Sequence, residues 1–257
     1  MASYQLAEEH LLSDIPAEAS GIAWNWDQST FFVVANFQGS VWEYTQDFQT
    51  LLRSIPLEGL DTDTEGVAYL GDGWLAISAE TNYVYVARVA ADSASISLAP
   101  EQTQVLQPCA APPVVNAGLE AIAYRPPDEA TPGRFFVGQE CQPMRVLQYD
   151  DAARTPPFEP ASYANGTLVV SEPWDAEVAL GGTVSDIAGM TYDTANDTLL
   201  LLSQASSRIL RVEPTQGTLI EELPLAGTSS AEGVALYGSC RLAVMSEPNR
   251  VQVYAPP

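Results

Sequence analysis

The chain has 257 residues, of which 33 are acidic and 10 are basic, and its formal net charge is -23. A negative field of this size repels phosphate backbones and anionic lipid headgroups, so we expect no binding to nucleic acid. We also expect no membrane insertion, because no apolar segment approaches the length of a membrane span. Cations are the expected partners, although an acidic surface also serves solubility.

A short phrase recurs five times, in which an acidic or small residue is followed by Gly or Ala, an aliphatic residue, Ala or Thr, and usually an aromatic residue. Its copies lie at residues 20–24, 65–69, 120–124, 188–192 and 232–236. The Gly or Ala position falls at residues 21, 66, 121, 189 and 233, so the copies are 45, 55, 68 and 44 residues apart. This spacing is typical of propeller blades.

Each phrase is followed by short β-rich segments between turn residues, which indicates antiparallel strands. In chain order and besides the five phrases, the expected strands are 4–12, 31–35, 40–44, 50–57, 74–78, 83–89, 134–138, 145–149, 198–203, 208–212, 218–225, 241–246 and 250–254. The Pro-rich stretch 152–174 is interpreted as an insertion, with a displaced outer strand near 167–171.

The repeats predict an all-β fold, a five-bladed β-propeller with four antiparallel strands in each blade. The last repeat ends at Pro257 without room for an outer strand, and residues 4–12 supply one. Such closure protects sheet edges from pairing with other chains. We expect one propeller domain over residues 1–257.

Acidic residues fall at equivalent positions of the repeats, which predicts a metal site at one mouth of the ring. The innermost strands begin at Ser20, Glu65, Glu120, Ala188 and Glu232, and the second strands end at Asn36, Glu80, Glu140, Gln204 and Glu247. In antiparallel blades both sets lie at one end of the ring. Converging carboxylates repel one another unless they hold a cation or a proton. Oxygen ligands without His or Cys favour Ca²⁺ over Mg²⁺.

The segments 65–73, 118–124, 139–143 and 246–249 resemble the SdiA-regulated family, which includes YjiK-like proteins. The resemblance covers nearly the whole chain and implies a β-propeller that is often exported or envelope-associated. The inner-ring order Ser, Glu, Glu, small, Glu is also similar to the calcium-activated nucleotidases (apyrases). That resemblance implies an axial Ca²⁺ held by Ser20, Glu65, Glu120 and Glu232. This chain has Ala188 where a Ser ligand is found in those enzymes, so we expect the backbone carbonyl of Ala188 or a water molecule to fill that place.

Two functional classes remain open. In the first, the protein is a non-catalytic propeller with an axial Ca²⁺, and its acidic top face binds a small ligand or a protein. In the second, it is a Ca²⁺-dependent hydrolase of phosphoric or carboxylic esters, with Glu80, Glu140 or Glu247 as the base. His10 is the only histidine, so a Ser-His-Asp or Cys-His arrangement is not expected.

Cys109 and Cys141 flank two paired strands of one blade at the same edge, so either a disulfide or ordinary thiols are compatible with their positions. The first residues show no signal peptide. We interpret the chain as a mature domain with a periplasmic, secreted or envelope-associated location, and a cytosolic location is the alternative.

Overall fold

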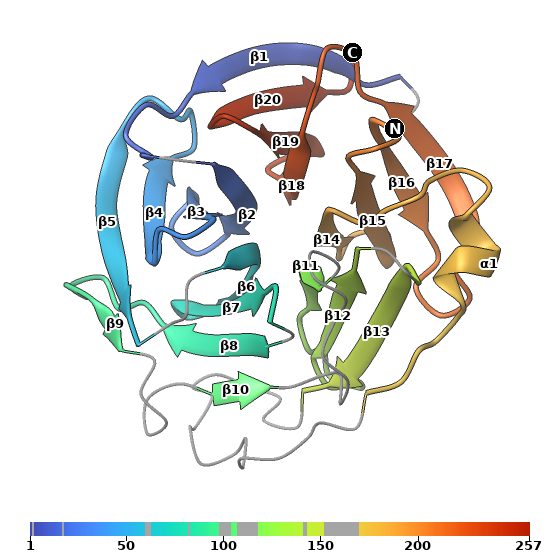
Figure 1. Ribbon diagram of the computed structural model, residues 1–257, viewed down its shortest axis with the longest axis horizontal. Helices are drawn as coiled ribbons and strands as arrows, with labels where there is room; N and C mark the ends of the chain where they lie inside the picture. The colour runs from blue at the N-terminus through green and yellow to red at the C-terminus, as the bar shows by residue number, and fades with distance from the viewer. Residues whose placement is uncertain are drawn as a thin grey trace.

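The computed structural model describes residues 1, 3–16, 18–59, 63–81, 83–97, 118–140, 143–151 and 170–257, and residues 104–106 as backbone. Five small antiparallel sheets stand around a central axis like the blades of a propeller (Figure 1). The predicted fold class is therefore confirmed.

Each phrase of the sequence repeat forms the innermost strand of one blade, and the following strands lie successively further from the axis. The blades consist of the following strands: β2 (Ala19–Asn25), β3 (Thr30–Ala35), β4 (Ser40–Thr45) and β5 (Leu51–Glu58) in blade 1; β6 (Thr64–Gly71), β7 (Trp74–Ala79), β8 (Tyr83–Arg88) and β10 (Gln104–Leu106) in blade 2; β11 (Leu119–Arg125), β12 (Arg134–Gln139) and β13 (Arg145–Asp150) in blade 3; β14 (Gly189–Asp193), β15 (Thr198–Ser203), β16 (Arg208–Val212) and β17 (Leu219–Pro224) in blade 4; and β18 (Ala231–Tyr237), β19 (Arg241–Ser246) and β20 (Arg250–Ala255) in blade 5.

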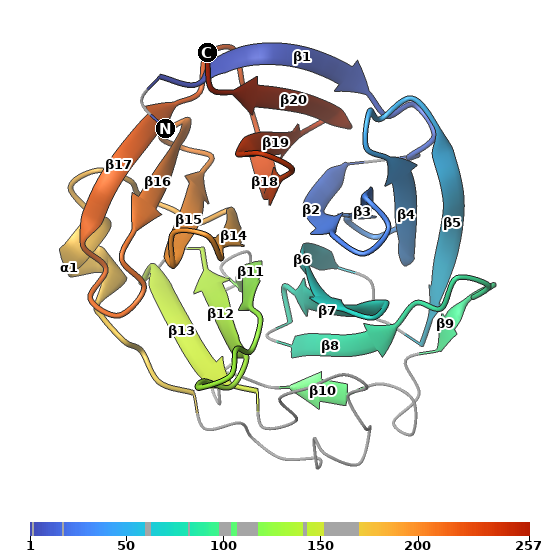
Figure 2. The same ribbon diagram turned by 180° about the vertical axis from the view of Figure 1, so that it is seen from behind.

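The first strand, β1 (Gln5–Leu11), completes blade 5 by pairing antiparallel with β20. Both views show it as the outer strand of that blade, next to the C-terminal end of the chain (Figures 1 and 2). The predicted closure of the ring by the N-terminal strand is confirmed. Asn249 secures the connection to blade 1, since its amide accepts from the N–H of Ala19 at 2.9 Å and donates to the carbonyl of Ile15 at 2.8 Å.

The two longer spacings between copies of the phrase, 55 and 68 residues, come from segments outside the inner strands. The short strand β9 (Ile96–Ser97) leaves blade 2 and pairs parallel with β5 of blade 1. In the described part of blade 3 the sheet has three strands, and its outer edge pairs through a single bridge between Gln148 and Ser171. That bridge lies at the end of the predicted segment 167–171, of which residues 167–169 are outside the described residues.

The described residues include one short helix, α1 (Ala176–Leu180), which the sequence pattern did not predict. Asp175 caps its N-terminus by accepting from the N–H of Val178 at 2.9 Å. Ala176 and Leu180, together with Trp174, are buried in the cluster between blades 3 and 4. Over the described ranges, the structure contains no helix of the length and apolar character needed to cross a membrane.

The hydrophobic core lies between neighbouring blades, in five clusters. Because side chains of a strand alternate between its two faces, the inner strands of blades 1, 2, 3 and 5 each contribute to two clusters. Blade 4 reaches its second cluster through β15. Ile22 packs with residues of blade 5, including Tyr237, whereas its neighbour Ala23 packs with Val67 of blade 2. Each blade is therefore stabilised by burial against both of its neighbours.

Glycines in the repeat phrase allow the inner strands to approach one another near the axis. A Cβ atom added to Gly66 would lie 2.8 Å from the carbonyl oxygen of Glu120 and 2.9 Å from the nitrogen of Ile122. Gly21 and Gly233 face the backbone of a neighbouring inner strand in the same way. The small residue is required here because the obstacle is backbone, which cannot rotate away.

Replacement of Gly66 by Ala is expected to destabilise the fold by about 1 to 3 kcal/mol, because blades 2 and 3 must separate to accommodate the methyl group. The measurement is the midpoint of denaturant unfolding. Gly182→Ala is the matched control, since its added Cβ would meet nothing within 4 Å and its φ is not positive. Equal midpoints for the two variants would contradict the close approach of the inner strands.

Candidate metal site at the acidic mouth of the ring

Four of the five predicted inner-ring residues lie at β-bulges. The strand register shifts between Ala19 and Gly21, between Thr64 and Val67, between Leu119 and Ala121, and between Ala231 and Gly233, so each shift includes Ser20, Glu65, Glu120 or Glu232. A bulge adds a residue to one strand and redirects its side chain. The bulges therefore place these side chains at one mouth of the ring, out of the regular alternation.

Blade 4 has no bulge at the equivalent position, and its inner-ring residue is Ala188, whose side chain has no oxygen atom. β14 starts at Gly189 with no register shift, and the N–H of the preceding Ala188 donates to the carbonyl of Leu202 at 2.9 Å. Ala188 lines a constriction of the channel, with a volume of about 10 Å³, rather than the acidic mouth. At the inner-ring position, blade 4 thus has neither a bulge nor a side chain that could coordinate a metal.

Equivalent backbone hydrogen bonds hold the ends of the second strands beside the inner-ring positions. In four blades, the N–H at the end of the second strand donates to the carbonyl two residues before the inner-ring position. These bonds run from Asn36 to Glu18 at 3.0 Å, from Glu80 to Asp63 at 3.1 Å, from Glu140 to Gly118 at 3.2 Å and from Glu247 to Ser230 at 2.9 Å. The repeat therefore brings the two sets of residues to the same end of the ring.

An open pocket of about 270 Å³ lies at this mouth. Most of its lining is acidic: Asp63, Glu65, Glu80, Glu120, Glu140 and Glu232 line it together with Asn36, Phe37 and Gln204. Six carboxylates thus share one small volume, and among the pocket's lining residues no basic side chain occurs. Ser20, Ala188 and Glu247 do not line this pocket.

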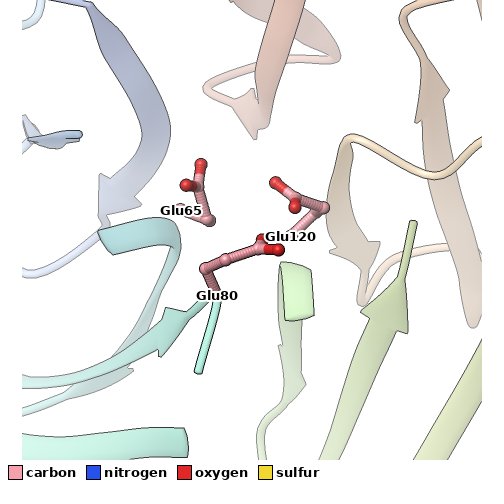
Figure 3. A group of neighbouring side chains, drawn as sticks. All are labelled: Glu65, Glu80 and Glu120. Atoms are coloured by element: carbon pink, nitrogen blue, oxygen red, sulfur yellow. The ribbon is translucent and has the colours of Figure 1, made fainter. Parts of the chain in front are cut away.

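Three of the carboxylates form a cluster that fits a single ion. One oxygen each of Glu65, Glu80 and Glu120 lies within 4.8 Å of the others. Glu65 and Glu120 project toward the open centre of the ring, and Glu80 extends toward Glu120 (Figure 3). All three donors are carboxylate oxygens, the ligand type that hard cations such as Ca²⁺ and Mg²⁺ prefer. The cluster is therefore a candidate site for a hard divalent cation.

The cluster is electrostatically strained without a cation. Burial, with the nearby charges of Asp63 and Glu80, raises the pKa of Glu65 to about 8. Burial and a hydrogen bond to Glu80 raise the pKa of Glu120 well above its usual range. Burial and the charges of Glu247 and Glu140 raise the pKa of Glu232 to about 7. These groups consequently retain protons near neutral pH unless a cation replaces them.

Two amides flank the carboxylates. Gln204 donates from Nε2 to Glu232, and this hydrogen bond partly offsets the rise in the pKa of Glu232. With its amide nitrogen facing the ring, Asn36 donates to Glu65 Oε2 at 3.1 Å and to Ser20 Oγ at 3.0 Å. Asn36 and Gln204 thus orient inner carboxylates by hydrogen bonding, without adding charge.

The structure separates roles that the repeat pattern had grouped. Ser20 is buried and donates from Oγ to the carbonyl of Thr64 at 2.7 Å, so it links blades 1 and 2. Glu80, predicted as a candidate base, lies in the cluster of three carboxylates with Glu65 and Glu120 and also accepts from the N–H of Gly118 at 3.1 Å. The position of Glu80 at the end of a second strand predicted that it lies at this mouth. The spacing of the repeats did not show that its side chain reaches Glu120.

The predicted pair Cys109 and Cys141 lies outside the described residues. Cys240 is an exposed free thiol at the turn between β18 and β19. It lies on the opposite side of blade 5 from Glu232, since β18 begins beside Glu232 and ends before this turn.

The comparison with protein families agrees with the resemblance seen in the sequence. The model of the SdiA-regulated family matches residues 1–254. The chain therefore belongs to the SdiA-regulated family. The match includes all five repeats and the N-terminal strand that closes the ring.

Solved structures with similar folds have low sequence identity to this SdiA-regulated protein. Glutaminyl cyclase from Myxococcus xanthus aligns with a TM-score of 0.62 and 14% identity, over 98% of this chain and 95% of that chain. A luciferin-regenerating enzyme aligns with a TM-score of 0.56 and 13% identity, over 96% and 94% of the two chains. A chain of a nidogen/laminin complex aligns with a TM-score of 0.57 and 15% identity, over 90% and 73%. These similarities support the propeller fold alone.

Proposed function

We propose that the acidic mouth binds one Ca²⁺ ion through Glu65, Glu80 and Glu120, and that the ion and the surrounding face bind a small ligand or a partner protein. The convergence of three carboxylates within 4.8 Å carries this proposal. Glu232 lines the same pocket from the opposite side and adds negative charge around the ion. Ser20 and Ala188, which were predicted as ligands, do not line the pocket and are not ligands in this proposal.

The residues of the mouth divide into holding and orienting groups. Glu65, Glu80 and Glu120 hold the ion, while Asn36 and Gln204 keep carboxylates in place by hydrogen bonds. Bound Ca²⁺ supplies a Lewis-acid centre with coordination positions beyond the three carboxylates, for oxygen atoms of water or a ligand. An anionic or carbonyl ligand requires this ion, because the acidic pocket by itself repels negative charge.

Replacement of Glu120 by Gln is expected to weaken Ca²⁺ binding at least about tenfold, which corresponds to about 1.4 kcal/mol. The physical reason is the loss of one anionic ligand at nearly unchanged side-chain volume. Isothermal titration of metal-free protein with CaCl₂ measures the effect. The matched control is Glu129→Gln, which removes one charge from an exposed residue between β11 and β12. Equal weakening in both variants would show a general charge effect and no defined site.

A hydrolase is the second candidate, and the position of Glu140 favours it. Glu140 lines the same pocket, and its charge contributes to the raised pKa of Glu120, yet it is not one of the three clustered carboxylates. A carboxylate beside a metal-bound water is suited to act as a general base. Hydrolysis of nucleotide, phosphomonoester or aryl-ester substrates that requires Ca²⁺ and is lost in Glu140→Gln would support this candidate. No turnover, with Ca²⁺ binding intact, would support the non-catalytic one.

An exported location is part of the same proposal. Extracellular modules bind Ca²⁺ weakly, at the high concentration found outside cells, and a site held by a few carboxylates suits that range. Fractionation of cells that express the native gene product tests it. Recovery of the protein in the cytosolic fraction alone would contradict an exported location and leave the metal proposal to the titration above.

A further inference from the structure

A second pocket, of about 280 Å³, lies at the opposite mouth of the channel. The inner strands start at the acidic mouth, and four residues later, at about 3.3 Å per residue, they reach this second mouth. Aromatic side chains from all five blades gather here: Trp24, Trp26, Tyr69, Tyr124, Tyr192 and Tyr237. The constriction of about 10 Å³ between the mouths holds at most about one water molecule, so the two pockets are separate sites.

Three of the four tyrosines that line the aromatic pocket donate their hydroxyl groups to carboxylates. Tyr69 donates to Asp27 Oδ2 at 2.5 Å, and Tyr124 donates to Asp151 Oδ2 at 3.0 Å. Tyr192 likewise donates to Asp197. The pocket therefore offers ring surface backed by negative charge. Rings whose phenol oxygens donate to carboxylates carry more electron density, which strengthens their attraction for a cation.

Trp26 forms the accessible edge of the pocket. Its side chain is 43% exposed, and its ring meets that of Tyr69 edge to face, at 4.7 Å between centroids and 72° between planes. Two perpendicular rings make a corner that a rounded apolar cation contacts on two sides. Such corners are the common element of aromatic cages for quaternary ammonium groups.

The cationic side chains around the pocket are already paired. Arg211 binds Asp193 at 2.5 Å, and Arg125 donates to the carbonyl of Pro132 at 2.6 Å. Arg241, whose guanidinium lies over the ring of Tyr237 at 5.7 Å, is paired with Glu8. The net charge of -23 adds a field that attracts cations and repels anions.

From this combination we propose that the aromatic pocket binds a small organic cation with a quaternary ammonium head. The trimethylammonium group presents methyl surface to Trp26 and Tyr69, and its charge faces rings that are hydrogen-bonded to Asp27, Asp151 and Asp197. The size of the pocket, at the lower end of the range for ligand sites, suits a head group with a short tail. This site is independent of Ca²⁺ binding at the acidic mouth.

The test compares choline with its uncharged isostere 3,3-dimethylbutan-1-ol, at constant ionic strength, by titration calorimetry and tryptophan fluorescence. We expect saturable choline binding that is at least about tenfold stronger than binding of the isostere. Trp26→Leu is expected to weaken choline binding about tenfold, and this exposed position tolerates substitution without loss of the fold. Glu120→Gln, at the other mouth, is expected to leave choline binding within about twofold of the native value.

Three outcomes would overturn the proposal. Equal binding of choline and its isostere would show a merely apolar pocket. Loss of choline binding in Glu120→Gln, with no change in Trp26→Leu, would place the cation at the acidic mouth. Absence of saturation with choline, in protein whose Ca²⁺ titration is normal, would show that the aromatic corner holds no cation.

Discussion

Metal-free protein is expected to lose stability as the pH rises from about 5 to about 8.5, and Ca²⁺ is expected to restore most of what is lost. The groups responsible are Glu65, Glu120 and Glu232, whose pKa values are raised in the folded state. An unfolded Glu has an ordinary pKa, so the folded protein binds more protons over this interval. Stability then falls as the pH rises.

The direction of the change in stability and the pH interval follow from the pKa values in the unfolded and folded states. Below the unfolded value of 4.5, the stability associated with the raised pKa values is fully present, and it is lost as the pH rises through about 7 for Glu232 and about 8 for Glu65. Each unit of pKa difference corresponds to about 1.4 kcal/mol. The three carboxylates titrate as a coupled group, so these differences do not add in full. We expect a combined loss of about 3 kcal/mol, or about 6 to 12 °C in melting temperature for a chain of this size.

The measurement is the melting temperature of metal-free protein across this pH range, with and without a saturating concentration of CaCl₂. The stabilisation by Ca²⁺ is expected to increase with pH, because protons and the ion compete for the same carboxylates. Glu120→Gln should flatten the pH dependence and reduce the stabilisation by Ca²⁺, whereas Glu129→Gln should behave as the native chain. A calcium shift that is constant across the pH range would contradict the link between these carboxylates and the ion.

Removal of residues 1–11 is expected to lower the free energy of unfolding by about 3 to 6 kcal/mol and to make the protein self-associate. β1 pairs with β20 through six residue pairs. Hydrogen bonds of this kind contribute about 0.5 to 1.5 kcal/mol each. The exposed edge of β20 then offers unpaired N–H and C=O groups to another chain. Denaturant unfolding measures the first effect, and light scattering measures the second.

A circular permutant separates the loss of the strand from the break in the chain. Joining residue 257 to residue 1 and opening the chain at the exposed turn 194–197 keeps β1 beside β20. We expect this permutant to be monomeric, with a stability close to that of the native chain. If the truncated protein were as stable and as monomeric as the permutant, β1 would be an accessory strand and closure of the ring would not depend on it.

The sequence by itself determined the architecture, because the blade is a local unit that is repeated. The strands expected at 198–203, 208–212 and 241–246 have these bounds in the structure, and the outer strand expected at 218–225 corresponds to β17. Closure by the N-terminal strand also followed from the count of strands in the last repeat. Turn residues and alternation of apolar side chains act over a few residues, so they can be read directly from the chain.

The sequence also predicted that the acidic residues lie at one mouth of the ring, but it did not predict which of their side chains form a cluster. Glu65 and Glu120 were expected together, and the cluster contains both. The side-chain partnership with Glu80 depends on how far apart blades 2 and 3 lie, which the contact of Gly66 with the backbone of Glu120 decides. A spacing of repeats along the chain contains no information about this distance.

Only the tertiary structure decided which equivalent positions serve the site. Ser20 and Glu232 occupy the same repeat position and both lie at bulges, yet Ser20 donates to a neighbouring strand while Glu232 lines the acidic pocket. Ala188 has neither a bulge nor a place in that pocket. The physical reason is that side-chain direction at an inner strand depends on the register with its sheet and on packing against the adjacent blade. Both are contacts between residues far apart in the chain, which local sequence patterns do not specify.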